Sequence, residues 1–226
     1  MTAPRVRLHL TFARLAPRAV ILRQGPSRQF RMILWHTDTD AFEDGQWVKQ
    51  KVYPERCALA PDGRHFLYFL LDGKWQGPGE GAYTAISRPP WFTALALFPE
   101  GNTWGGGGEF LDSRHYIASG GPDILGRDTG LTRLYRQTPT RENRTGLVTR
   151  DGRRACLPRD VRRRLIEGDD WRKPDRYRAE GGRLYRRDGA GLALIRDFTD
   201  MEFAEIVAPY DPGPAPGPAP AARGRA

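Results

Sequence analysis

Cysteine and long apolar runs are scarce in this sequence, and each scarcity excludes a class of protein. The 226 residues include 2 cysteines, too few for the framework of a disulfide-rich secreted domain. Cys57 could pair with Cys156, but its apolar neighbours favour a buried free thiol. No run approaches the ~18 apolar residues of a membrane-spanning helix. Arg7, His9 and Arg14 interrupt the apolar core that a signal peptide needs. We expect a cytoplasmic protein that does not enter a membrane.

Recognisable catalytic and metal-binding motifs are also missing. The chain has no Gly-x-Ser-x-Gly elbow, no His-Glu-x-x-His and no Cys-x-x-Cys. His65 and His115 occupy equivalent positions in two similar segments, and a repeated fold explains this recurrence without a shared metal. The carboxylates between Asp38 and Asp44 lack the remaining ligands of a calcium loop. We therefore expect no metal site and no cofactor, and we favour a protein that is not an enzyme.

Positive charge is abundant and concentrated in one part of the chain. The formal net charge is +9. The segment from Arg141 to Arg187 holds 16 basic and 8 acidic residues, so nearly the whole excess lies there. Most basic residues are arginines, whose planar guanidinium groups match phosphate oxygens better than lysine does. A composition bias of the genome explains the arginine content equally well.

Short apolar runs separated by glycine and proline dominate the chain, as is typical of an all-β protein. Pro61-Asp62-Gly63 is a strong turn signal between two such runs. Residues 66–71 are apolar throughout, which predicts a strand buried on both faces. Residues 6–12 alternate apolar and polar, which predicts a strand with one buried face. Further strands are expected over residues 19–23, 30–35, 42–48, 57–60, 82–87, 92–98, 115–119, 131–137 and 146–149.

One turn and the strand that follows it recur along the chain. The residues from Asp112 to His115 match those from Asp62 to His65 position for position, 50 residues later. Upstream, Arg18 precedes another apolar strand, 46 residues before Arg64. A period of this size, with about four strands in each unit, is typical of the blades of a β-propeller.

The run from Ala60 to Arg64, followed by Phe66-Leu67-Tyr68, resembles the WD40-like repeat of the TolB type. That repeat has a Ser-Pro-Asp-Gly-Arg/Lys turn before an aromatic-aliphatic strand, and here Ala60 replaces the serine. The resemblance implies a small or irregular β-propeller over residues 1–211, with about four blades that are each a four-stranded antiparallel meander. An incomplete ring closed by a homodimer is an open alternative. The resemblance transfers no function, because propellers serve as enzymes, binding platforms and scaffolds.

The pattern changes after residue 150. Apolar residues at helical spacing, with Pro158 early and Gly168 at the end, predict one short helix near residues 158–167. The composition from Pro212 onward predicts a disordered Pro/Gly/Ala-rich tail over residues 212–226. Between them, a last meander of strands is expected over residues 177–179, 183–187, 192–197 and 203–207.

The loop of residues 88–92 is the strongest candidate for a partner-binding surface. Two consecutive prolines interrupt strand pairing there, and Arg88, Trp91 and Phe92 flank them. Exposed tryptophan and arginine dominate binding hot spots, whereas the alternative is a strand break whose aromatic rings belong to the core. We add Trp104 to this surface, at the expected mouth of the propeller channel. The four glycines after it are expected to allow close approach of the backbone.

The basic segment supports a different function, the binding of a polyanion. Arginine forks match phosphate oxygens, and clustered positive charge attracts nucleic acid without sequence specificity. The acidic residues within the segment favour instead a solvated, internally paired face. If the segment binds nucleic acid, the expected anion-binding residues are Arg153, Arg154, Arg162, Arg163 and Arg164.

A propeller hydrolase is the third function that the sequence leaves open. Its acidic groups would be residues such as Asp62 or Glu109 near the central channel. Of the three, we favour a non-enzymatic module that binds a protein partner, and the expected contact residues are then those around Trp91.

Overall fold

The protein is mostly β in the computed structural model, which describes residues 6–162, 176–189 and 191–210. The strands form five sheets, most of them antiparallel, and this confirms the all-β prediction. Residues 159–162 are helical, so the first turn of the predicted helix is present. The rest of that helix and the predicted tail lie outside the described residues.

The first sheet is a four-stranded antiparallel meander in chain order. It comprises β1 (Arg7–Phe12), β2 (Arg18–Gln24), β3 (Phe30–His36) and β4 (Ala41–Val48), with a 3-10 turn, η1 (Pro26–Arg28), between β2 and β3. Its two central strands are buried on both faces. They are buried because neighbouring sheets cover both sides of the meander, as described below.

The second sheet is organised around its central strand, β7, which is buried on both faces as the sequence predicted. The predicted strand over residues 92–98 is wrong in its first half, because pairing begins only at Ala96. Gln46 Oε1 on β4 accepts hydrogen bonds from the backbone amides of Phe92 and Thr93 at 2.8 and 2.9 Å. These amides are therefore not available for strand pairing. The elements of this sheet are β5 (Lys51–Val52), η2 (Pro54–Arg56), β6 (Ala58–Leu59), β7 (Phe66–Leu71), β8 (Ala82–Ser87) and β9 (Ala96–Pro99).

The third and fourth sheets depart from the predicted antiparallel meander. The strand predicted over residues 131–137 is divided at Leu134, whose side chain is buried in the core. Before Leu134 the chain pairs in parallel with β11, and after it the chain pairs with β14. The third sheet is β10 (Gly108–Phe110), β11 (His115–Ala118) and β12 (Thr132–Arg133), and the fourth is β13 (Tyr135–Arg136) and β14 (Leu147–Val148).

The fifth sheet, near the end of the chain, packs against the first. It is an antiparallel meander of β15 (Tyr177–Glu180), β16 (Arg183–Asp188) and β17 (Gly191–Asp197). Its Leu184 lies in one core cluster with Trp35 of β3. The last sheet of the chain is therefore a neighbour of the first one, as in a circular arrangement.

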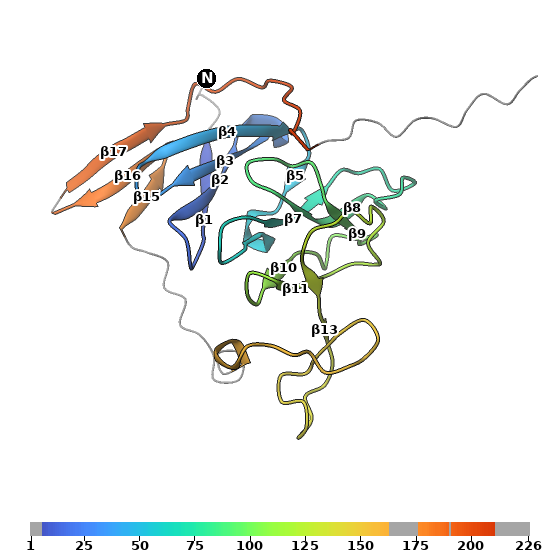
Figure 1. The fold of residues 1–226 in the computed structure, drawn as a ribbon. Coiled ribbons are helices and arrows are strands. Elements are labelled where there is room, and N and C mark those ends of the chain that lie inside the picture. The colour runs from blue at the N-terminus through green and yellow to red at the C-terminus, as the bar shows by residue number, and fades with distance from the viewer. Residues whose placement is uncertain (1–5, 163–175, 190, 211–226) are drawn as a thin grey trace, which may run out of the picture.

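The five sheets stack in an arc in the order fifth, first, second, third and fourth (Figure 1). One core cluster joins the first sheet to the second, and its members include Met32 of β3 and Tyr68 of β7. The next cluster joins the second sheet to the third, and a further one joins the third to the fourth. Among the described residues no core cluster joins the fourth sheet to the fifth, so the arc stays open there.

A C-terminal segment of residues 198–210 crosses from the fifth sheet past the first to the second (Figure 1). The strand predicted over residues 203–207 is wrong, since these residues have no regular structure. Side chains hold the segment instead of a strand ladder. Gln46 Nε2 donates to the carbonyl of Ile206 at 2.9 Å, and the Tyr210 hydroxyl donates to the carbonyl of Thr93 at 2.9 Å.

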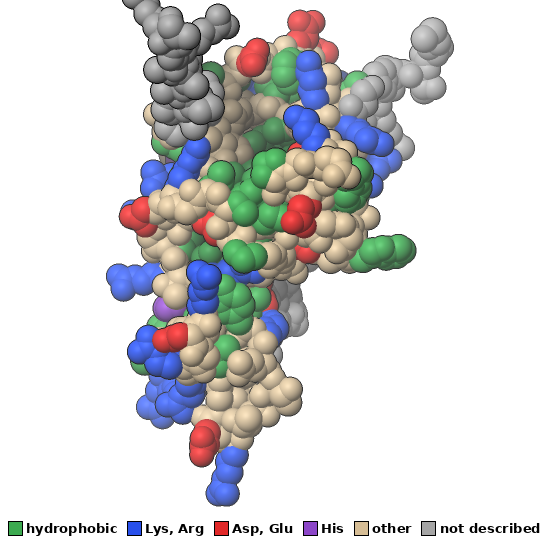
Figure 2. All heavy atoms as spheres, turned by 90° about the vertical axis from the view of Figure 1, so that its right-hand side faces the viewer, with side chains coloured by type: hydrophobic (Ala, Val, Ile, Leu, Met, Phe, Trp, Pro, Cys, Tyr) green, Lys and Arg blue, Asp and Glu red, His purple; other side chains and the backbone are tan. Residues whose placement is uncertain are grey.

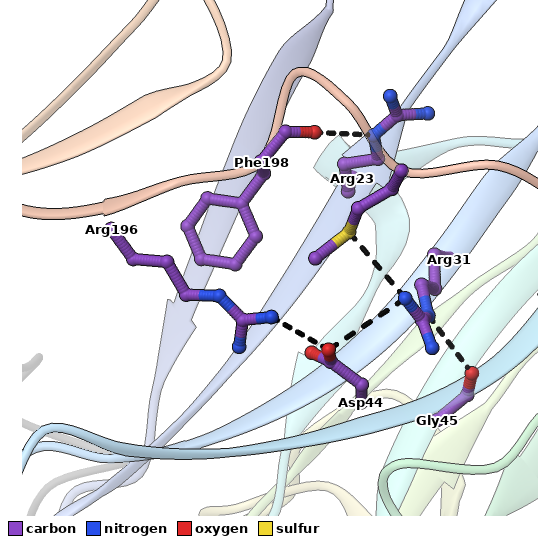
Figure 3. Close-up of polar contacts among 7 residues, drawn as sticks. Arg23, Arg31, Asp44, Gly45, Arg196 and Phe198 are labelled. Carbon is purple, nitrogen blue, oxygen red and sulfur yellow. Dashed lines mark hydrogen bonds and ion pairs between the residues drawn. The ribbon is translucent and has the colours of Figure 1, made fainter.

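Buried and half-buried arginines connect this segment to the first sheet (Figure 3). Arg23, which is 3% exposed, donates to the carbonyls of Phe198 at 3.0 Å and Thr199 at 2.9 Å. Asp44 of β4 also forms an ion pair with Arg196 of β17, at 2.6 Å. The first sheet is thus joined to the C-terminal segment and to the fifth sheet by charged groups as well as by apolar packing.

The recurring turn of the sequence has the same local structure in both copies. Asp62 accepts a hydrogen bond from the amide of Arg64 at 3.0 Å, and Asp112 accepts one from the amide of Arg114 at 2.7 Å. These side chains fix a tight turn before β7 and before β11, because each satisfies the amide two residues later. The match between the two sequence segments therefore reflects a shared turn.

The glycine run after Trp104 has the close contacts that the sequence predicted. A Cβ on Gly106 would lie 2.3 Å from the ring of Phe69, and one on Gly107 would lie 2.5 Å from the carbonyl oxygen of Arg56. Both residues also have positive φ. No residue other than glycine fits these positions without displacing the second sheet.

Candidate anion-binding site

A hollow of about 920 Å³ lies beside the helical turn of residues 159–162. Its walls come from the loop of residues 141–145 and from residues 154–162. Figure 2 shows Lys and Arg side chains gathered over the lower part of the molecule, where Figure 1 places β13 and the loops that follow it. We call this site the arginine hollow, because the arginines that line it are Arg141, Arg144, Arg154, Arg159 and Arg162.

The loop that forms one wall is organised by Asn143. Its backbone amide donates to the Thr140 hydroxyl at 3.0 Å, and its side-chain Nδ2 donates to the carbonyl of Leu147 at 3.0 Å. Its Oδ1 accepts from the Thr145 hydroxyl at 2.9 Å. These bonds hold the loop against β14, so Arg141 and Arg144 are presented from a fixed backbone.

The opposite wall is held by apolar packing. Leu157 and Val161 are buried in one cluster with Leu147 of β14 and Leu134. Because the inward side of residues 157–161 is committed to this core, the charged side chains of the helical turn are left at its outer surface. The core of the fourth sheet therefore brings two segments, about ten residues apart in sequence, to one hollow.

Positive charge in the arginine hollow is only partly balanced. Two carboxylates, Glu142 and Asp160, accompany the five arginines, which leaves a formal excess of three positive charges. Some arginines elsewhere form ion pairs, as Arg183 does with Asp197 at 2.6 Å. Within the described residues the arginines of the hollow that form no ion pair are Arg141, Arg144, Arg159 and Arg162.

The arginines predicted to bind anions are divided by the structure. Arg154 and Arg162 line the hollow, and Arg154 also donates to the carbonyl of Glu142 at 2.8 Å. Arg153 does not line it and instead forms an ion pair with Asp151 at 2.6 Å. The other two predicted residues, Arg163 and Arg164, lie outside the described residues.

Three arginines of the hollow were not singled out from the sequence, namely Arg141, Arg144 and Arg159. The only signal for them was the charge excess of the whole segment. No local pattern in the sequence shows that the loop of residues 141–145 meets the helical turn, because that contact depends on the core around Leu147.

The predicted partner-binding residues do not form one surface. Phe92 is 6% exposed and belongs to the core between the first two sheets, so its side chain is not available to a partner. Trp91 is half-buried. Arg88 is exposed, but its guanidinium lies 5.7 Å from the centre of the Tyr210 ring, on the C-terminal segment. Trp104 is 93% exposed.

Trp104 also lies far along the second sheet from the other three residues. The residues from Arg88 to Phe92 follow the end of β8, whereas Trp104 follows the end of β9. Since β8 and β9 are antiparallel, the loops that follow them lie at opposite ends of the sheet. A single contact surface would have to span its whole length.

The acidic residues considered for a hydrolase are engaged in local contacts. Asp62 accepts the turn hydrogen bond described above, and Glu109 forms an ion pair with Arg136. His115 contacts Asp112 at 2.9 Å through Nδ1, within its own turn. In the part of the chain that the structure describes, no group of three or more His, Cys, Asp or Glu side chains is arranged to hold a metal ion.

Comparison with known proteins does not add a function. No protein-family model, no curated protein and no solved structure matches this chain. Over the described residues, none of the helices has both the length and the apolar character required to cross a bilayer. A functional proposal therefore has to be argued from the side chains of the structure itself.

Proposed function

We propose that the protein is a non-enzymatic binding module that takes a phosphate-bearing polyanion in the arginine hollow. The observation that carries the proposal is the presence of four arginines there, among the described residues, without an ion-pair partner. Some arginines on the first and fifth sheets are ion-paired, whereas these four gather around one hollow without a pair in the described part of the chain. A set left unpaired around one hollow fits an anionic ligand better.

The arrangement favours an extended ligand over a single compact phosphate. A compact phosphate requires donors that converge on one point, whereas these arginines come from two walls of a wide hollow. Each guanidinium can engage a separate phosphate through a planar fork. A polyanion with regularly spaced phosphates can satisfy several of them at once, and binding of this kind weakens as salt rises.

An open β-propeller is the scaffold that we propose for this module. Its support is the order of the sheets, in which the last packs beside the first, and the recurrence of the turn at Asp62 and Asp112. The ring would be interrupted between the fourth and fifth sheets, next to the arginine hollow. On this view the hollow lies at the break in the ring, beside the fourth sheet.

The test is a salt titration of binding by fluorescence anisotropy, with a fluorescein-labelled oligonucleotide and with inorganic polyphosphate as competitor. We expect a Kd on the order of 10⁻⁴–10⁻⁶ M at physiological salt, rising steeply with salt. The variant is Arg141→Gln/Arg144→Gln/Arg159→Gln. The loss of three phosphate contacts should lower the slope of log K against log salt by about 2, at about 0.7 for each contact.

A matched control separates the hollow from the overall charge. The triple variant Arg7→Gln/Arg176→Gln/Arg178→Gln removes the same charge from exposed positions on β1 and next to or within β15. It should keep nearly all of the salt slope. Equal losses in the two triple variants would show that net charge, and not the hollow, binds the anion. No binding at low salt would overturn the proposed function.

A further inference from the structure

A second hollow, of about 760 Å³, is lined in part by residues that pair with those of the arginine hollow. The two linings are connected through β14 and residues 154–155. Val148 forms a β-bridge with Arg154, and the amide of Ala155 donates to the carbonyl of Leu147 at 3.0 Å. Thr145 and Arg154 line the arginine hollow, while Val148 lines the second one.

Aromatic rings give the second hollow a different character. Tyr135, a partly exposed residue of β13, lines it together with the more deeply buried Tyr116 and Phe98. We call it the tyrosine hollow. Thr132 and Gln137 place a hydroxyl and an amide at the same hollow. An apolar aromatic wall with a few polar groups is the usual character of a pocket for a planar ring.

The aromatic wall is stiffened by Arg133. Its guanidinium donates to the carbonyls of Ala118, Gly120 and Gly121 at 2.7–2.8 Å. It also lies 4.3 Å from the centre of the Phe98 ring and 5.0 Å from that of Tyr135. Because this arginine is held by three carbonyls, it supports the wall and does not collapse into the hollow.

Tyr116 supplies a neutral polar group at the tyrosine hollow. Burial raises the pKa of its hydroxyl to about 12, although nearby Arg133 opposes this. The hydroxyl is therefore protonated at neutral pH, and the described residues give it no hydrogen-bond partner. A ligand that enters the tyrosine hollow meets a hydroxyl that can donate or accept.

We infer that the polyanion is a single-stranded nucleic acid, with phosphates in the arginine hollow and a base in the tyrosine hollow against Tyr135. This inference rests on the proposed function and adds the class of ligand. Stacking on an aromatic ring next to a basic groove is how proteins bind single strands with little sequence preference. In a duplex the faces of the bases are already stacked, so a base cannot enter the hollow.

The experiment compares three ligands on the full chain: a labelled pyrimidine-rich single strand, a duplex of the same length and inorganic polyphosphate. We expect the single strand to bind about tenfold more tightly than the duplex. Tyr135→Leu should weaken single-strand binding by about tenfold, the effect of losing one stacked base, and leave competition by polyphosphate unchanged. Tyr135→Trp should retain single-strand binding because it retains a stacking face.

Tyr185→Leu is the matched control, since Tyr185 is a partly exposed tyrosine on β16 in the distant fifth sheet. It should bind all three ligands as the wild type does. Wild-type protein should also quench 2-aminopurine placed in the single strand, a readout of stacking that does not depend on the folding of a variant.

The outcomes separate the two proposals. The inference about the ligand is overturned, while anion binding stands, if three results occur together. Polyphosphate and duplex compete as well as the single strand, Tyr135→Leu binds the single strand as the wild type does, and 2-aminopurine is not quenched. If the Arg141, Arg144 and Arg159 variant binds every ligand as the wild type does, the proposed function itself fails.

Discussion

Arg23 Nε donates a hydrogen bond to the backbone carbonyl of Phe198 at 3.0 Å, which joins β2 to a residue 175 positions later. A second bond from the same guanidinium reaches Thr199. Burial lowers the pKa of Arg23, and the nearby Arg31 lowers it further. The arginine therefore carries a desolvation cost that its two carbonyl acceptors and the ring of Trp47, 5.3 Å away, offset.

Replacing Arg23 by methionine should destabilise the protein by about 2 kcal/mol or more, because one buried and one partly buried carbonyl lose a charged donor. Urea denaturation measures the free energy of unfolding. Arg7→Met, at an exposed position of β1, is the control and should change it by less than about 0.5 kcal/mol. A variant at position 23 as stable as the wild type would show that burial of the cation costs as much as its hydrogen bonds contribute.

Phe92 and Trp104 should respond in opposite ways to truncation. Phe92→Ala removes a ring from the core between the first and second sheets, and such a loss costs about 3–5 kcal/mol. Trp104→Ala removes a side chain that is 93% exposed and should change stability by less than about 0.5 kcal/mol. Thermal unfolding of the two variants decides this. A small effect at Phe92 would indicate an exposed ring, as the partner-binding prediction requires.

The free energy of unfolding should fall as the pH drops below about 6.5, with His65 as one cause. Burial lowers the pKa of His65, the nearby Arg88 and Arg64 lower it further, and Asp62 opposes them. Below the ordinary pKa of histidine, His65 is protonated in the unfolded chain but still neutral in the folded chain. The resulting loss of stability continues until the pH reaches the folded pKa.

The measurement is urea denaturation at a series of pH values between about 7.5 and 5, the window that the lowered pKa defines. His65→Gln should flatten the decline relative to the wild type. His9→Gln, on β1, shows what the loss of a different histidine does. A decline that persists unchanged in His65→Gln would assign the pH dependence to other groups.

Alanine substitutions at Gly106 and Gly126 separate the backbone strain of a positive φ from the steric clash of a new Cβ. Both have positive φ, at 96° and 63°, so alanine at either is strained by about 1 kcal/mol. At Gly106 the new Cβ would also lie 2.3 Å from the Phe69 ring, whereas at Gly126 there is nothing within 4 Å. Gly106→Ala should therefore be the more destabilising in urea denaturation, by about 1–3 kcal/mol. Equal effects would mean that the backbone at Gly106 or the Phe69 ring shifts to fit the new Cβ without a loss of stability.

Much of the secondary structure could be read from the sequence because strands and turns depend on near neighbours. The apolar run at β7 predicted burial on both faces, and the run at residues 19–22 on β2 has the same burial. Asp62 and Asp112 predicted equivalent turns, since the side chain that fixes each turn acts only two residues away. Structure that depends only on residues a few positions apart forms in the same way whatever the tertiary context.

The tertiary structure decided what depends on distant residues. Phe92 is buried, and residues 92–95 form no strand, because Gln46 binds the backbone there from 46 residues earlier. The segment after Phe198 is held by Arg23 and Gln46 and not by strand pairing, so its apolar residues misled the prediction.

The candidate site divides in the same way. The sequence by itself determined that positive charge is concentrated after residue 141, because charge is a sum over the segment. It could not determine which arginines share a hollow, since that requires the core around Leu147 to bring Arg141 and Arg144 to the helical turn of Arg159. Charge is carried by composition, whereas the convergence of charges on one ligand is set by packing between segments that the local pattern does not connect.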